Sequence, residues 1–110
     1  MTLDEYQALA RRTLGARTPE QQLANAALGL AGEAGEVAET IKKHLFHARP
    51  LDRDDVVKEL GDCLWYVAAV ATAVGVSLDE VAATNIDKLR RRYPDGFSPE
   101  ASARRADVGA

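Results

Sequence analysis

The chain has 110 residues, of which 46% are hydrophobic and 28% are charged, and its formal net charge is −3. This length and composition suit one folded, soluble domain and exclude a disordered chain. The acidic balance lacks the basic surface of nucleic-acid-binding proteins, so we expect no nucleic-acid partner. Aromatic residues make up only 5%. The core must therefore consist of small aliphatic side chains, which favours an oligomer.

The sequence also carries predictions about location. Asp4 and Glu5 stand where a signal peptide would have basic residues. The longest apolar run, residues 67–76, is too short to cross a bilayer. We therefore expect a cytoplasmic protein that does not contact a membrane. The single cysteine, Cys63, excludes an internal disulfide, and its apolar helical surroundings predict a packed thiol.

Start and stop signals divide the chain into helices. Thr2, Thr18, Asp52 and Ser77 are each followed by an apolar pattern with helical spacing, as expected of N-cap residues. Gly75 has the position of a C-cap. The predicted helices cover residues 3–14, 19–45, 53–74 and 78–92.

The end of the chain differs from the rest. Tyr93-Pro94-Asp95-Gly96 predicts a turn, and the segment from Ser98 is rich in Ala, Arg and Ser without periodicity. We therefore expect one domain over residues 1–97 and a flexible tail over residues 98–110. Because no strand pattern is present, the predicted class is all-α. The expected architecture is a helical bundle built on a long antiparallel helix hairpin, with a short leading helix and a closing helix.

Two pairs of carboxylates dominate the predicted hairpin. Glu33 and Glu36 lie three residues apart on the first long helix, and Glu59 and Asp62 have the same spacing on the second. Residues at this spacing share one helix face, so packing of the helices would bring four acids together. Glu59 and Asp62 also interrupt the helix over 53–74, which we expect to be largely buried. Uncompensated buried carboxylates are costly, and oxygen ligands suit Mg²⁺ bound together with phosphates.

Other features of the hairpin have competing interpretations. Gly29, Gly32 and Gly35 predict either close approach by a neighbouring helix or space for phosphates. His44 and His47 share a helix face but lack further nitrogen or sulfur ligands, which disfavours zinc. A di-iron bundle would need Glu-x-x-His, which is absent, and acids alone favour Mg²⁺ or Mn²⁺. The scarcity of aromatic residues argues against a glycosidase.

Three segments carry a family resemblance: Gly-Leu-Ala-Gly-Glu-Ala-Gly-Glu-Val-Ala-Glu at 29–39, Lys-Glu-Leu-Gly-Asp-Cys-Leu-Trp-Tyr at 58–66, and Asn85-Ile86-Asp87-Lys88-Leu89 with Arg91-Arg92-Tyr93-Pro94. Over about residues 20–97 the chain resembles the MazG-like nucleoside triphosphate pyrophosphohydrolases. These belong to the all-α NTP pyrophosphatase superfamily, with the all-α dUTPases and dCTP pyrophosphatases. Glu-x-x-Glu alone is common on charged helices. Its combination with Glu-x-x-Asp and Asn-x-x-Lys is specific.

The resemblance implies hydrolysis of a nucleoside triphosphate to the monophosphate and pyrophosphate, in nucleotide-pool house-cleaning. It makes Glu33, Glu36, Glu59 and Asp62 ligands of Mg²⁺, for which Mn²⁺ is a substitute. A water deprotonated with help from Glu33 or Glu36 would attack the α-phosphorus. Short family members assemble as dimers or tetramers, so the resemblance also implies a homo-oligomer with sites at or near the interface.

Substrate contacts are expected from residues outside the acid pairs. By resemblance, Lys88 would meet phosphate and Asn85 the sugar or base. Tyr66 lies one turn beyond Asp62 and is a candidate to stack on or bond to the base. Further candidates for phosphate contacts are Lys42, Lys43 and Arg92.

Two alternatives to a general NTP pyrophosphohydrolase stay open at this stage. One is a narrow pyrophosphatase for dCTP or dUTP, because base choice depends on contacts that the sequence does not place. The other is a non-catalytic helical interaction module. The module would explain the apolar stripes and the glycines but would not explain acids inside an apolar helix.

Overall fold

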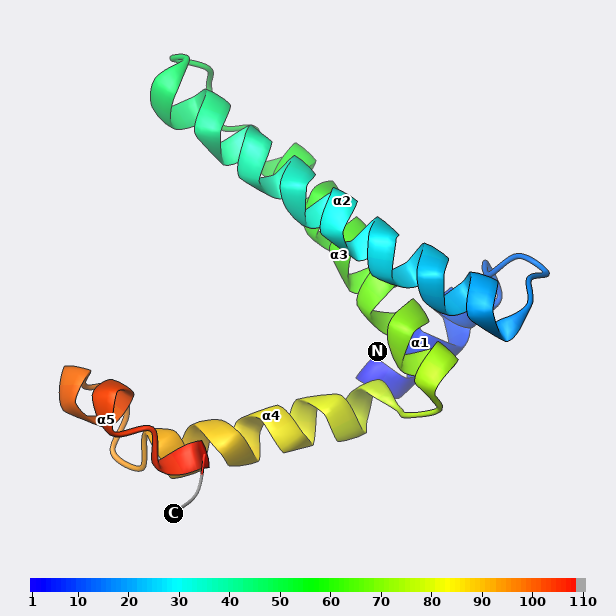
Figure 1. Ribbon diagram of the computed structural model, residues 1–110. Coiled ribbons are helices and arrows are strands. Elements are labelled where there is room, and N and C mark those ends of the chain that lie inside the picture. Colours follow the sequence, from blue (N-terminus) through cyan, green and yellow to red (C-terminus); the bar gives the residue numbers. More distant parts are fainter. Residues whose placement is uncertain (109–110) are drawn as a thin grey trace.

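The computed structural model describes residues 1–108 and is helical (Figure 1). The all-α class is confirmed. The elements are α1 (Leu3–Arg11), α2 (Pro19–Phe46), α3 (Arg53–Val74), α4 (Leu78–Arg92), α5 (Pro99–Arg104) and the short 3-10 helix η1 (Ala106–Val108).

Local capping explains where these helices begin and end. Thr2 and Thr18 each form a capping box with the third residue of the following helix. Gly75 ends α3 in the left-handed conformation, with φ of 81°. Only α1 departs clearly from its predicted range, since it ends at Arg11. There the carbonyl of Ala10 accepts from both the amide and the hydroxyl of Thr13, and this turn replaces the last predicted helical turn.

The long helices α2 and α3 lie side by side and antiparallel, and α1 packs against the end of α3 that is remote from the hairpin turn (Figure 1). The buried core is small and consists of Ala10, Ala68, Ala71 and Leu78. The expectation that α3 is largely buried is wrong for the single chain. Its apolar side chains Val57, Leu60, Leu64 and Val74 are exposed, because α2 covers only one side of the helix.

The chain bends sharply between α3 and α4. The chain direction bends by 101° from α3 to α4. Helix α4 runs away from the hairpin instead of closing over it (Figure 1). The buried side chain of Gln7 holds this elbow. Its Nε2 donates to the carbonyl of Val76 (2.9 Å) and to Thr72 Oγ1 (3.2 Å), and its Oε1 accepts from the amide of Leu78 (2.7 Å). Helix α1 therefore sets the direction of α4.

The C-terminal segment folds back on the end of α4. Arg92 donates to the carbonyl and hydroxyl oxygens of Ser102 (3.3 and 3.2 Å) and lies 3.8 Å from a carboxylate oxygen of Asp107. A hydrogen bond from Arg105 is the main reason that the pKa of Asp107 is lowered. This segment was expected to be a flexible tail. Its described part contains α5 and η1, and residues 109–110 of the expected tail lie outside the described residues.

None of the described helices is by itself both long and apolar enough to span a membrane, and the one pair that passes together, α3 with α4, is bent at the elbow.

Candidate active site

A hollow of about 380 Å³ lies between α2, α3 and the turn that follows α1, and one member of each acid pair lines it. The acids are Glu33 from α2, which is half-buried, and Asp62 from α3, which is exposed. The charge of Asp62 and partial burial together raise the pKa of Tyr6 on α1, with burial as the larger cause. The full lining of the hollow is Thr13, Glu33, Asp62, Trp65 and Tyr66. The predicted convergence of the two acidic motifs is therefore found for Glu33 and Asp62.

Two aromatic side chains form the wall of this hollow. The rings of Trp65 and Tyr66 meet edge to face with centroids 4.9 Å apart. The indole Nε1 of Trp65 donates to Thr13 Oγ1 (2.6 Å), whose hydroxyl donates in turn to the carbonyl of Ala10. The indole is thus fixed to the turn that follows α1. The hollow therefore offers both aromatic surface and carboxylates to a bound molecule.

Tyr66 lies directly on the backbone of α2 at Gly29. A Cβ atom built on Gly29 would overlap the ring and would lie 2.6 Å from its Cδ1. No atom of the described chain lies within 4 Å of a Cβ built on Gly32 or Gly35. Close approach of a neighbouring helix therefore explains the first glycine, whereas the other two face open space in the single chain.

The second member of each acid pair lies outside this hollow. Glu36 is exposed and Glu59 is half-buried. Thr40 Oγ1 donates to Glu59 Oε1 (2.8 Å), but the other oxygen, Oε2, is buried without a hydrogen-bond partner among the described residues. An unpartnered buried carboxylate oxygen is destabilising. A cation or a donor from a ligand would remove this cost.

The donor set suits a hard divalent cation, because all four predicted ligands offer oxygen. Among residues 1–108, no three acidic, histidine or cysteine side chains are arranged closely enough to hold an ion as they stand. Mg²⁺ usually keeps several waters and takes only one or two carboxylates together with substrate phosphates. The chemistry of the acids and the unpartnered oxygen of Glu59 therefore fit Mg²⁺ bound together with a phosphate substrate.

Asn85 and Lys88 lie apart from these acids within one chain. They line a second hollow of about 380 Å³ on α4, which shares no residue with the first. Its remaining lining residues are Val76, Glu80, Val81 and Thr84. The direction of α4 away from the hairpin explains the separation (Figure 1).

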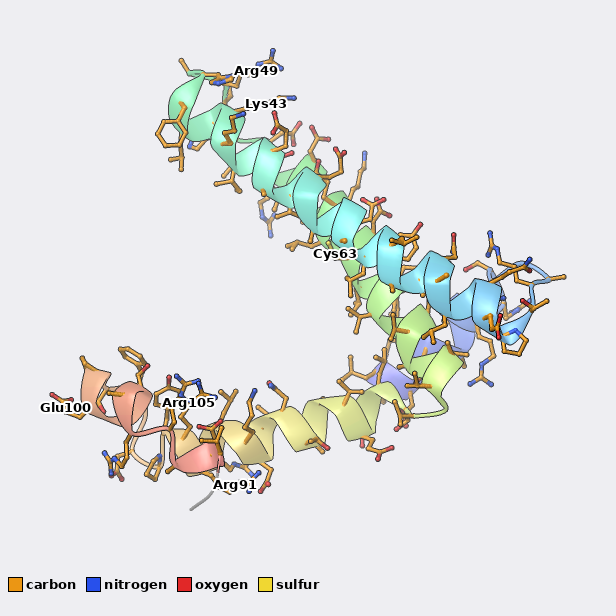
Figure 2. All side chains as sticks on the ribbon, in the orientation of Figure 1. Lys43, Arg49, Cys63, Arg91, Glu100 and Arg105 are labelled. Atoms are coloured by element: carbon orange, nitrogen blue, oxygen red, sulfur yellow. The ribbon has the colours of Figure 1, made fainter. Side chains whose placement is uncertain are left out.

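The remaining predicted phosphate contacts lie at the two far ends of the molecule. Lys42 and Lys43 pair with Glu39 on the surface of α2, at 3.8 and 3.9 Å. Figure 2 shows Lys43 close to the hairpin turn, near Arg49. Arg92 is held by the C-terminal segment at the end of α4, where Figure 2 labels Arg91 and Arg105.

The structure adds residues that the sequence reasoning did not select. These are Thr13, which holds Trp65, and Thr40, which holds Glu59. Thr40 follows Glu36 by four residues and therefore shares its helix face. That spacing was the available signal for Thr40. Thr13 has no such signal, because its contact with Trp65 joins residues far apart in the chain.

Comparison with known proteins now gives the family. Residues 21–97 match the MazG nucleotide pyrophosphohydrolase domain. The chain belongs to this family. Family membership makes it a hydrolase that acts on nucleoside triphosphates, and the resemblance seen in the sequence is confirmed.

Curated relatives agree with the family assignment. The Gene 37 protein of Mycobacterium phage L5 is 37% identical over 105 residues, covering 87% of this chain and 92% of the phage protein. The dCTP pyrophosphatase 1 proteins of Bos taurus and Mus musculus are 31% and 30% identical over 120 aligned positions, covering 97% of this chain and 68% of each relative. No solved structure gives a significant match.

Proposed function

We propose that the chain hydrolyses a nucleoside triphosphate to the monophosphate and pyrophosphate with the help of a divalent cation held by Glu33, Glu36, Glu59 and Asp62. The observation that carries the proposal is Glu59, whose Oε2 is buried without a partner among the described residues while Oε1 accepts from Thr40 of the neighbouring helix. An unpartnered buried oxygen lowers the stability of the folded chain. A role as a metal ligand would explain why the carboxylate is present despite this cost. Mg²⁺ is the expected cation and Mn²⁺ its substitute.

All four acids would hold the cation, and one of the two on α2 would also act as the base. When bound, the cation would neutralise charge on the triphosphate and lower the pKa of a water molecule. Glu33 or Glu36 would take the proton from the water that attacks the α-phosphorus. Thr40 fixes one oxygen of Glu59 by its hydrogen bond, so the other oxygen is held in one orientation. Asp62 lines the hollow with Glu33 and would hold the cation there.

In this proposal the base lies beside the aromatic wall of the hollow. Tyr66 offers a ring on which a base stacks, and Trp65 holds that ring in place through their edge-to-face contact. Similarity to dCTP pyrophosphatase 1 favours a pyrimidine deoxynucleotide as the narrower alternative to a broad range of NTPs. The proposed role is nucleotide-pool house-cleaning in the cytoplasm. The family assignment favours an enzyme over the interaction module.

We further propose that the active form is a homo-oligomer, a dimer or a tetramer. The single chain exposes 7972 Å², whereas a compact monomer of 11.9 kDa exposes about 5,900 Å². Its radius of gyration is 17.0 Å, compared with about 13 Å for a compact domain of this length. The excess of about 2,000 Å² per copy corresponds to a large, permanent interface. The exposed apolar side chains of α3 supply suitable surface for it.

The same assembly would complete the site. Within one chain, Asn85 and Lys88 line a different hollow from Glu33 and Asp62. Helix α4 projects from the molecule and is free to reach a neighbouring copy (Figure 1). In the proposed oligomer, α4 of one copy brings Lys88 to the phosphates held by the acids of another. Lys42, Lys43 and Arg92 remain further candidates for phosphate contacts.

The decisive experiment measures pyrophosphate release from a panel of NTPs and dNTPs, with and without Mg²⁺. Wild-type protein should be active only with the metal. Glu59→Gln should lower kcat/KM by about a hundredfold or more, the size expected for a key electrostatic contribution. Glu20→Gln, which removes the same charge in the exposed first turn of α2, is the matched control and should retain activity.

Metal binding has a second readout that does not need turnover. Mg²⁺ should raise the melting temperature of the wild type, because a ligand that binds only the folded state stabilises it. The rise should be smaller for Glu59→Gln. Wild-type protein that is inert on every nucleotide and whose melting temperature ignores Mg²⁺ would overturn the proposal and return the interaction module to consideration.

A further inference from the structure

We propose that Gly29 is a positioning residue, which fixes the ring of Tyr66 and thereby sets the space available for the nucleotide beside Glu33 and Asp62. The inference rests on the proposed function, because it assumes that the substrate occupies the hollow between α2, α3 and the turn that follows α1. Gly29 does not line that hollow and acts only through Tyr66.

The ring of Tyr66 leaves no room for a side chain at Gly29. A Cβ on Gly29 would overlap Cε1 and Cζ of the Tyr66 ring and would lie 2.6 Å from Cδ1. Carbon atoms in favourable contact are about 3.5–4.0 Å apart. Any side chain at position 29 would therefore push the ring by roughly 1 Å or more. The absence of a side chain is what allows the ring to rest on the backbone of α2.

The surroundings of the Tyr66 ring limit the directions in which it can be displaced. Trp65 lies against it with ring centroids 4.9 Å apart, and Trp65 is itself held by its hydrogen bond to Thr13. Helix α2 blocks the ring on the side of Gly29. The open direction is the hollow of about 380 Å³ that Tyr66 lines. A displaced ring therefore takes up space that the nucleotide would need.

The contact between Gly29 and Tyr66 lies close to the two acids along the helices. Gly29 and Glu33 are one turn apart on α2, and Tyr66 and Asp62 are one turn apart on α3. Because the helices are antiparallel, the contact between Gly29 and Tyr66 lies one turn from Glu33 and Asp62 along both helices. A shift of the ring therefore changes the space next to the carboxylates. The acids themselves stay on their own helices and keep their positions.

These steps predict a specific kinetic pattern for Gly29→Ala. The KM for the best nucleotide should rise about tenfold or more, while kcat changes by less than about threefold, since binding space is lost and the acids are not moved. In a Tyr66→Ala background, Gly29→Ala should have no further effect on KM, because the ring through which it acts is gone.

Stability and fluorescence separate this role from a general folding defect. Alanine favours a helix over glycine at any interior position, so Gly32→Ala, which meets no atom within 4 Å, is the matched control for stability. It should raise the melting temperature, whereas Gly29→Ala should not. The single tryptophan, Trp65, reports on the neighbouring ring without any substrate. Its fluorescence should change in Gly29→Ala and stay unchanged in Gly32→Ala.

The outcomes distinguish the positioning role from the proposed function. A wild-type protein without activity on any nucleotide would refute the function, whatever the fluorescence shows. An active wild type whose KM is unchanged by Gly29→Ala would refute the positioning role alone. A rise in KM that persists in the Tyr66→Ala background would refute it as well, because Gly29 would then act by another route.

Discussion

Two inactive variants should restore each other's activity when they are mixed, because the acids and Lys88 are expected to meet across two copies. One variant is Glu59→Gln and the other is Lys88→Ala. Each should be inactive or nearly so when pure. The first lacks a proposed metal ligand in every site, and the second lacks a proposed phosphate contact in every site.

The expected recovery follows from the two separate hollows of the single chain. If each site takes Glu59 from one copy and Lys88 from another, equal mixing makes about a quarter of the sites intact. Pyrophosphate release should therefore reach about a quarter of the wild-type rate per site. The figure is the same for a dimer and a tetramer, because each site still draws on two copies. Co-expression from one cell ensures that the copies mix.

The matching physical measurement is the mass in solution. Light scattering after gel filtration should give at least twice the chain mass of 11.9 kDa. A monomer at micromolar concentration would refute the oligomer, because an interface of about 2,000 Å² per copy should not dissociate there. An oligomer in which mixing restores nothing would refute the shared site. Full activity of pure Lys88→Ala would remove Lys88 from the site.

Two further predictions concern the elbow and the C-terminal segment. Gln7→Leu should lower the free energy of unfolding by about 3 kcal/mol and the melting temperature by about 10 °C or more, since its three partners lose their buried or partly buried hydrogen bonds. Calorimetry should show a much smaller effect for Gln22→Leu, whose side-chain bond to Gly15 is exposed. The pKa of Asp107 is lowered below its ordinary 3.8, so its contribution to stability is present above about pH 3.8 and is lost as the pH falls through the folded-state pKa. The protection of residues 99–108 against amide exchange, measured relative to the intrinsic exchange rate at each pH, should therefore fall in acid. A loss of protection of the same size in Asp107→Asn over the same pH range would contradict the assignment.

Most helix boundaries were predictable because they depend on local chemistry. The caps at Thr18, Asp52, Ser77 and Gly75 each act within a few residues of the chain, and α3 and α4 begin and end where these signals placed them. Helix α1 was predicted too long because the hydroxyl of Thr13 closes its last turn. The hydroxyl competes with the helix for the same carbonyl, and sequence spacing does not show which one wins.

The arrangement of the helices was less predictable. An apolar stripe on α3 indicates that a surface will be covered, but it does not say whether the same chain or another copy covers it. Leu60 and Leu64 were expected to be buried and are exposed in the single chain. The direction of α4 depends on Gln7, whose partners lie more than sixty residues away. Local patterns contain no information about such a contact.

In the candidate site, too, local features were predictable and contacts between distant residues were not. The spacing of the acids placed Glu33 and Asp62 on facing helices, and both line one hollow. The contact between Gly29 and Tyr66 depends on how two helices pack. The sequence alone therefore left two interpretations of the glycines, which were close approach of a helix and space for phosphates. The roles of all the predicted site residues stay predictions until the variants are measured.

The elbow at Gln7 also means that a small rotation of α4 moves residues far along that helix by a large distance. Lys88 lies ten residues beyond the start of α4 at Leu78, a distance of about 15 Å along a helix. A rotation of α4 by about 10° at the elbow would therefore move Lys88 by roughly 2–3 Å. Misplacement by about 1 Å can slow a reaction a hundredfold. The hydrogen bonds of one buried glutamine thus determine where α4 carries Lys88. The accuracy of a shared site would therefore depend on how rigidly α1 holds the start of α4.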